Sequence, residues 1–166
     1  MLALALFVLL FPALALARPW MGITPMESTK NDVIGKFGEP KKKVQQGDKE
    51  VIAYLGDRAI RGTTQAHFTV LASGKVEQIS VFPASKVDLS EVEETYGKAC
   101  ADLDKAAQLV TACYVKQLTD EFRTYFWYKR AGLVVFFAED KKTVHSIVFS
   151  APVKDAAAAG AAPSAP

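Results

Sequence analysis

The sequence predicts an α+β fold built as a tandem repeat, in which each copy is a helix followed by an antiparallel β-sheet. A helix-start phrase at 29–38 returns 59 positions later, at 88–97. Each phrase precedes runs that alternate apolar and polar residues, the pattern of half-buried strands. The chain has 166 residues and 50% of them are apolar, enough for one domain or two small fused ones. We expect the sheets to form a curved surface with the helices packed on one face.

The first predicted helix has a marked start and a marked end. Thr29 and Asp32 form a capping box, in which side-chain oxygens satisfy free backbone N–H groups. Gly38 suits the left-handed residue that follows a helix, and Pro40 prevents its continuation. The face expected to pack on the sheet carries Val33, Ile34 and Phe37.

Two hairpins are expected after this helix. Phe68 and Ile79 alternate with His67 and Gln78, so one face of the sheet is apolar and the other polar. This is the pattern of an antiparallel sheet with one solvent-facing side. The strands are predicted at 42–45, 50–55, 66–71 and 76–82.

The second copy repeats the helix signals and adds an insertion. Asp88 is the predicted N-cap, Glu91 its capping-box partner and Gly97 the stop. The insertion, 98–113, has two interpretations: a helix over 101–112, or a loop held by a disulfide. Strands are then expected at 122–129, 133–138 and 144–150.

The two ends of the chain differ from its middle. An uncharged apolar run, 2–17, ends in Ala-Leu-Ala, which is typical of a signal-peptide cleavage site. The run is shorter than the roughly 20 residues of a membrane span. We expect an exported, periplasmic or secreted protein with no membrane span after cleavage, and an uncleaved anchor is the alternative. The predicted parts are a signal peptide at 1–17, repeats at 18–84 and 85–152, and a disordered Ala/Pro-rich tail at 153–166.

Export gives the two cysteines a meaning. Cys100 and Cys113 are the only cysteines, and an oxidising compartment favours their pairing. Two buried thiols are the alternative. Two cysteines without further ligands do not make a zinc site, and their spacing is not that of a redox motif.

Groups for catalysis are scarce in the sequence. His67 and His145, the two histidines, both lie in predicted strands, and no nucleotide-binding or hydrolase motif is present. A net charge of +2 with scattered basic residues does not favour nucleic acid as a partner. We therefore expect no catalytic residues, no cofactor and no metal.

The second copy is richer in aromatic residues than the first. Its strands at 122–129 and 133–138 carry large apolar side chains on both faces, and the second face needs a cover. The cover comes either from the chain itself or from a partner. Tyrosine, tryptophan and arginine dominate protein-binding hot spots. The predicted protein contacts are Tyr125, Trp127, Arg123 and Lys129.

The opening of the first copy resembles a known family. Residues 25–33, followed by Phe37-Gly38-Glu39-Pro40, are similar to the opening of the SmpA/OmlA (BamE-like) envelope domain. That domain shares its helix-plus-sheet layout with the tandem repeats of β-lactamase inhibitor proteins. The sequence of residues 125–137 is also similar to this superfamily. The resemblance implies a non-enzymatic periplasmic or surface protein that binds other proteins.

These observations predict a non-catalytic, exported protein-binding or scaffold protein of the bacterial cell envelope, such as an accessory of outer-membrane assembly. A secreted inhibitor of a hydrolase, acting through its sheet face, is the alternative. Arg18, not a cysteine, follows the predicted cleavage site, which argues against the lipid-anchored members of the family.

Overall fold

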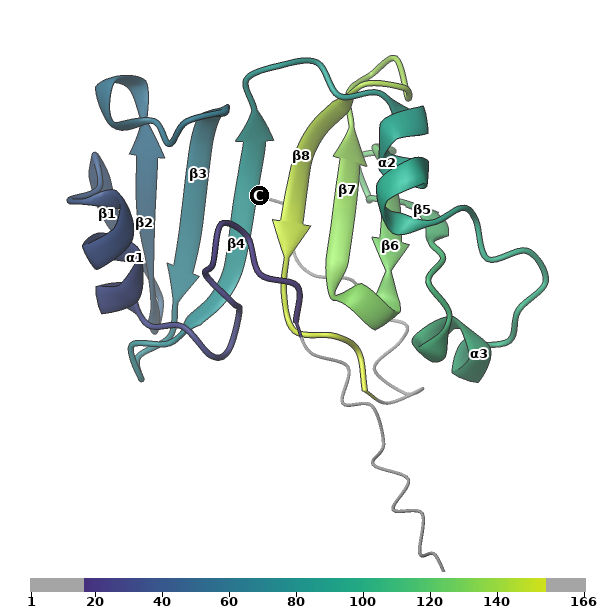
Figure 1. Cartoon of the computed structure of the whole chain (residues 1–166), viewed down its shortest axis with the longest axis horizontal. Coiled ribbons are helices and arrows are strands. Elements are labelled where there is room, and N and C mark those ends of the chain that lie inside the picture. Colours follow the sequence, from purple (N-terminus) through teal and green to yellow (C-terminus); the bar gives the residue numbers. More distant parts are fainter. Residues whose placement is uncertain (1–16, 155–166) are drawn as a thin grey trace, which may run out of the picture.

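The computed structural model describes residues 17–154, whose strands form one continuous antiparallel sheet (Figure 1). Its strand order is β1-β2-β3-β4-β8-β7-β6-β5, so that β1 and β5 are the two edges. The strands are β1 (Lys42–Gln46), β2 (Lys49–Leu55), β3 (Thr63–Val70), β4 (Val76–Pro83), β5 (Val115–Leu118), β6 (Thr124–Tyr128), β7 (Leu133–Phe137) and β8 (Val144–Phe149).

The predicted fold class, a tandem repeat of helix plus sheet, is wrong. The molecule is mostly one eight-stranded sheet with a few short helices. Pairing of β4 with β8, which places Ile79 opposite Phe149 and Val81 opposite Ile147, makes the sheet continuous. This pairing joins residues about 70 positions apart in the sequence. Local alternation predicts hairpins but carries no signal for such a long-range pair.

The helices of residues 17–154 are short and start where capping predicts. The backbone N–H of Thr29 donates to the Asp32 carboxylate at 2.7 Å, and that of Asp88 donates to the Glu91 carboxylate at 2.8 Å. The two longest helices, α1 and α2, lie in front of the sheet in Figure 1. The helical segments are α1 (Lys30–Phe37), α2 (Leu89–Tyr96), α3 (Lys105–Val110) and the 3-10 turns η1 (Gly56–Arg58) and η2 (Lys129–Ala131).

The main core lies between these helices and one face of the sheet. Val33 of α1 and Val92 of α2 are fully buried and belong to one apolar cluster that spans the sheet. The cluster includes Phe68 in one half of the sheet and Phe126 in the other. A single core therefore serves both halves of the chain.

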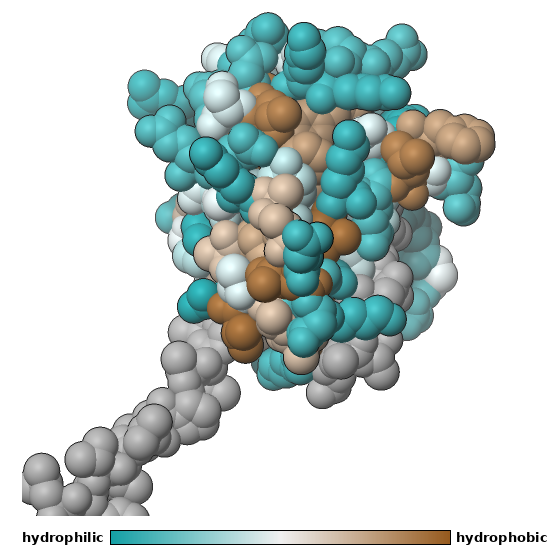
Figure 2. Space-filling model, turned by 90° about the vertical axis from the view of Figure 1, so that its right-hand side faces the viewer, coloured by the Kyte–Doolittle hydropathy of each residue, from teal (hydrophilic) through white to brown (hydrophobic). Residues whose placement is uncertain are grey.

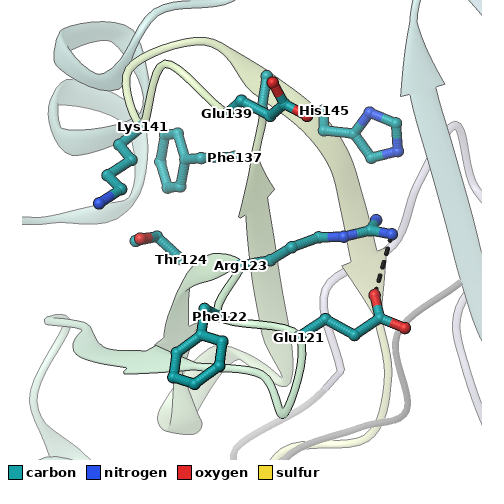
Figure 3. Close-up of a pocket in the computed structure, with 9 residues that line it drawn as sticks. Glu121, Phe122, Arg123, Thr124, Phe137, Glu139, Lys141 and His145 are labelled. Carbon is teal, nitrogen blue, oxygen red and sulfur yellow. Dashed lines mark ion pairs between the residues drawn. The ribbon is translucent and has the colours of Figure 1, made fainter.

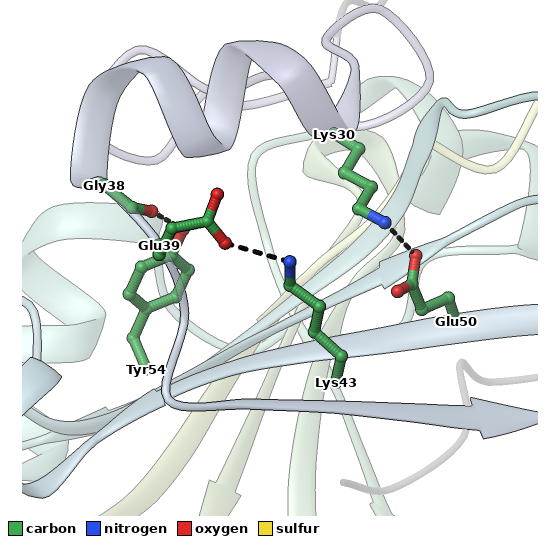
Figure 4. A network of polar contacts seen from close by, with 6 residues as sticks. All are labelled: Lys30, Gly38, Glu39, Lys43, Glu50 and Tyr54. Atoms are coloured by element: carbon green, nitrogen blue, oxygen red, sulfur yellow. Dashed lines mark hydrogen bonds and ion pairs between the residues drawn. The ribbon is translucent and has the colours of Figure 1, made fainter.

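A tyrosine fixes the end of each long helix to the sheet. The Tyr54 hydroxyl donates to the Gly38 carbonyl at 2.7 Å (Figure 4), and the Tyr128 hydroxyl donates to the Gly97 carbonyl at 2.9 Å. An ion pair between Lys30 and Glu50 (2.5 Å) also joins α1 to β2. These contacts hold the helices against one face of the sheet.

The opposite face of the sheet is polar over β3 and β4 and apolar over the half made of β5 to β8. His67, Thr69 and Gln78 of β3 and β4 lie half-buried there, following the predicted alternation. In the half made of β5 to β8, a second apolar cluster forms on this face. Its members are Tyr125, Trp127, Val134, Phe136 and Val148, with Val153 packed against them.

The insertion after α2 combines a short helix with a disulfide. The predicted bond between Cys100 and Cys113 is confirmed, with Cα atoms 5.0 Å apart. The insertion holds only α3, and then the chain enters β5, a strand that the sequence did not predict. A disulfide of this kind is typical of proteins in oxidising compartments.

Two predictions on the chain ends lie outside the described residues. These are the signal peptide, except for Ala17, and the tail from residue 155 onward. Across residues 17–154, no helix has the length and apolarity needed to cross a membrane.

Removing the disulfide should destabilise the protein. Replacing Cys100 and Cys113 together with alanine frees a loop whose ends are 13 positions apart, so the free energy of unfolding should fall by about 3 kcal/mol. Urea denaturation of both proteins measures the difference, and wild type under reducing agent serves as the control. An unchanged midpoint in both cases would contradict a stabilising role.

Candidate functional site

The structure does not present the four predicted contact residues as one surface. Tyr125 is 7% exposed, Trp127 1% and Lys129 4%, whereas Arg123 lies at the surface. The aromatic strand β6 lies between β5 and β7, and both of its faces pack within the chain. The binding patch predicted on Tyr125 and Trp127 therefore needs correction, and of the four residues only Arg123 is available to a partner.

The buried residues of this group have structural contacts. The Tyr125 hydroxyl donates to the Gln117 side chain of β5. The Lys129 ammonium donates to Gln108 Oε1 of α3 at 2.8 Å and lies 5.1 Å from the centre of the Trp127 ring. Burial lowers the pKa of Lys129. These side chains attach β5 and α3 to the sheet.

Arg123 lines a pocket of about 500 Å³ (Figure 3). The pocket lies between two hairpin loops, the one that joins β5 to β6 and the one that joins β7 to β8. Its interior wall includes Phe137, which is buried in the main core. Around its mouth stand charged and aromatic side chains from both loops. We call this set of residues the hairpin-tip site: Phe122, Arg123, Glu139, Lys141 and His145.

The hairpin-tip site carries charges of both signs around an apolar interior. The Arg123 guanidinium pairs with the Glu121 carboxylate at 3.1 Å (Figure 3). Glu139 and Lys141 form no ion pair with any residue between 17 and 154. Within the same range, no three His, Cys, Asp or Glu side chains are placed to hold a metal ion. The arrangement is an apolar interior with charged side chains at its rim.

Phe122 is the most unusual residue of the site. Its side chain is 79% exposed and its backbone φ is +59°, a left-handed conformation that favours glycine. Its N–H donates to the Thr119 carbonyl at 2.9 Å, and the Thr119 N–H donates to the Arg123 carbonyl at 2.9 Å. This is a turn followed by a left-handed residue, the hairpin loop in which that residue is usually glycine.

The hairpin between β3 and β4 has the same hydrogen bonds and does use glycine. There the Gly74 N–H donates to the Leu71 carbonyl at 2.8 Å, and the Leu71 N–H donates to the Lys75 carbonyl at 2.9 Å. Gly74 has a φ of +80°. The same loop conformation therefore has glycine at its left-handed position in one hairpin and an exposed phenylalanine in the other.

The second loop of the site repeats this departure. Lys141 has a φ of +58°, and its N–H donates to the Ala138 carbonyl at 2.9 Å. The hairpin between β1 and β2 has Gly47 at its left-handed position, with a φ of +62°. Strained residues persist where surrounding structure and function maintain them. Both hairpins that border the pocket contain such a residue, whereas the β1–β2 and β3–β4 hairpins of the other half have glycine at the left-handed position.

Asp140 organises the second loop. Its carboxylate accepts from the N–H groups of Lys142 (2.9 Å) and Thr143 (2.8 Å) and from the Thr143 hydroxyl (2.6 Å). These hydrogen bonds, that of the Thr143 hydroxyl first, lower the pKa of Asp140 to about 2. The loop is therefore held in shape at neutral pH.

Sequence reasoning missed Phe122 as a site residue. Residue 122 was predicted to be the first position of a strand, because aromatic residues favour strands. The signal that was available is the absence of glycine from 119–123, where the comparable text Ala72-Ser73-Gly74-Lys75 contains one.

Comparisons with known proteins support the fold alone. No protein family and no curated protein matches the chain. Among solved structures, a DUF4309 family protein (YjgB) from Bacillus subtilis is similar, with a TM-score of 0.52, 16% identity, and coverage of 78% of this chain and 82% of that one. A cysteine-rich secretory protein (SAV1118) from Staphylococcus aureus aligns over 75% of this chain and 42% of that one, at 10% identity and a TM-score of 0.38.

The resemblance to the SmpA/OmlA (BamE-like) domain is wrong. No family matches the chain, and the similar structure from Bacillus subtilis is described as a DUF4309 family protein. The capping-box phrase that carried the resemblance is a general signal for a helix start. It therefore identified the helices and not their family.

Phe122→Gly should stabilise the protein. Glycine removes the cost of the left-handed conformation but adds freedom to the unfolded chain, so we expect a net gain of about 0.5–1 kcal/mol. Gly74→Ala is the matched control: space is open around its Cβ position, so the backbone cost alone should lose about 1 kcal/mol. Urea denaturation measures both. Destabilisation by Phe122→Gly would mean that the exposed ring supports the fold.

Asp140→Asn should weaken the protein in a pH-dependent way. The lowered pKa of Asp140 means that its ionised form stabilises the fold above about pH 4, and that this contribution is lost as the pH falls toward 2. Thermal unfolding across this range should show a difference between wild type and variant that closes at low pH. A difference that stays constant with pH would contradict this role of the carboxylate.

Proposed function

We propose that this protein is a non-catalytic, exported binding protein of the cell envelope that recognises a protein partner through the hairpin-tip site. The observation that carries the proposal is Phe122. A large aromatic side chain, 79% exposed, stands at a backbone position where glycine would be more stable. Selection for folding alone does not explain this choice, whereas selection for a contact does.

The composition of the site favours a protein as the partner. An aromatic ring beside an arginine, next to an apolar pocket and surrounded by charges of both signs, has the anatomy of a protein interface. Glu139 and Lys141 are available for ion pairs with a partner, since neither has one among residues 17–154. The disulfide supports the exported setting.

A catalytic role has less support at this site. His145 is the residue best suited to acid–base chemistry, yet its ring packs edge-on against Phe82, with ring centres 5.5 Å apart. The side chain of a catalytic base is held instead by a hydrogen bond to an orienting group.

Secreted inhibition of an enzyme is the second candidate, because Phe122 stands on an exposed hairpin tip. Such a tip suits insertion into a cleft as well as docking on a surface. The two functions use the same contact and differ in its consequence. They separate once the partner is known, because only an inhibitor abolishes an activity of that partner.

A photo-crosslinking amino acid at position 122 should capture one partner in the native cell envelope. The same amino acid at Val44, which is 50% exposed on the opposite edge strand, is the matched control. We expect an adduct from position 122 and none from 44, and weakening of the captured protein's binding by at least tenfold in Phe122→Gly. Equal adducts at both positions, or full binding by Phe122→Gly, would refute the proposal.

A further inference from the structure

We propose that the outer edge of β5 is a strand-addition site, where an extended segment of the partner protein pairs antiparallel with Lys116–Leu118. The inference rests on the proposed function, since it assigns this segment to the partner that occupies the hairpin-tip site. The segment is expected to carry an apolar residue and, two positions later, an acidic one.

The backbone of β5 leaves hydrogen-bonding groups free on its outer side. The Tyr114 N–H donates to the Lys98 carbonyl at 3.1 Å, and the Tyr114 carbonyl accepts from the Cys100 N–H at 2.9 Å, so both groups of Tyr114 point away from β6. Because backbone direction alternates along a strand, the N–H and C=O groups of Lys116 and Leu118 point the same way. β5 ends the sheet, so no strand of residues 17–154 pairs with them.

Residues 98–100 pair with Tyr114, just before β5, and the chain then turns away from the edge of the sheet. Ala99 forms a parallel bridge with Tyr114, and the disulfide holds Cys100 beside Cys113 at this point. The Ala101 N–H then donates back to the Ala99 carbonyl at 3.0 Å, and Asp102 has a φ of +50°. The chain thereby turns toward α3, and no other part of residues 17–154 pairs with the outer edge of Lys116 and Leu118.

The lysines at the two edges of the sheet differ in their ion pairing. Along β1, the lysines next to the edge are engaged: Lys43 pairs with Glu39 at 2.9 Å and Lys41 pairs with Asp57 at 2.7 Å. These lysines already have acidic partners, so they gain less from a carboxylate on an added strand. On β5, Lys116 is exposed and has no ion pair with residues 17–154, and Leu118 is 56% exposed.

The side of the molecule that carries β5 displays apolar groups among polar ones (Figure 2). Exposed large apolar side chains there belong to Val110, Leu118 and Phe122. A strand beside β5 gains most from a carboxylate opposite Lys116 and an apolar side chain opposite Leu118. In an antiparallel strand, the residue opposite Leu118 precedes the residue opposite Lys116 by two positions, which gives the order apolar, any residue, acidic.

A second copy of this chain fits the edge less well. Two β5 strands related by a two-fold axis would pair Lys116 of each copy with Leu118 of the other, since these are the residues whose backbone groups face outward. That register opposes a charge to an apolar side chain twice and offers no acid to either lysine. The charges therefore favour a different protein over a copy of this one.

A peptide probe tests the edge directly. We would add a nine-residue peptide, Thr-Thr-Val-Thr-Leu-Thr-Glu-Thr-Thr, to the full chain and follow amide hydrogen exchange by NMR. Exchange at Lys116 and Leu118 should slow at least tenfold, while Lys43 of β1 is unaffected. No protection at saturating peptide, or equal protection of both edges, would overturn the proposal.

Edge variants provide the matched control. Lys116→Pro removes an outward N–H and a charge, a change that edge strands tolerate, and should weaken peptide binding at least tenfold. Lys43→Pro makes the same change on β1 and should leave binding unchanged. If Lys116→Pro fails to fold, Lys116→Glu replaces it and should prefer the peptide with lysine in place of glutamate. Unchanged binding by Lys116→Glu would overturn the proposal.

The captured partner separates this inference from the proposed function. If Phe122→Gly loses the partner and Lys116→Pro keeps it, strand addition is refuted and the hairpin-tip site stands. If both variants keep it, the proposed function fails as well. A dimer seen by sedimentation that Lys116→Pro abolishes would identify a second copy as the occupant and overturn the assignment to a different protein.

Discussion

The short pairing between β4 and β8 is the contact on which the rest of the structure depends. Only Ile79–Val81 and Ile147–Phe149 take part, yet they turn two four-stranded meanders into one sheet. Apolar residues of both β4 and β8 belong to the same buried cluster as Val33 and Val92, so one core holds both helices. The pairing also removes two inner edges. It leaves β1 and β5 as the places where another strand can join.

The sequence predicted local features well because their causes are local. The capping boxes at Thr29 and Asp88, the disulfide and seven of the strands depend on residues close together in the chain. The sheet order depends on contacts between distant residues, so the fold class was wrong. β5 was missed because its four residues, Val-Lys-Gln-Leu, are too short a run for alternation to stand out.

The candidate site shows a similar division. Composition pointed to four contact residues, of which Arg123 lies at the surface and Tyr125, Trp127 and Lys129 are buried. Tyr125 and Trp127 are large and apolar and became core, because β5 and β7 flank their strand. Phe122, which looked like the first residue of that strand, became the exposed tip through its left-handed backbone. A backbone angle at one residue, invisible to composition, decides which aromatic side chain faces solvent.

The central claim is that a protein partner binds at the tips of the β5–β6 and β7–β8 hairpins. Hydrogen–deuterium exchange of the full chain, with and without the captured partner, tests it most directly. The account predicts slower exchange confined to residues 115–123 and 138–145. Protection centred instead on the half-buried polar face around His67, Thr69 and Gln78, with none at the hairpin tips, would contradict it.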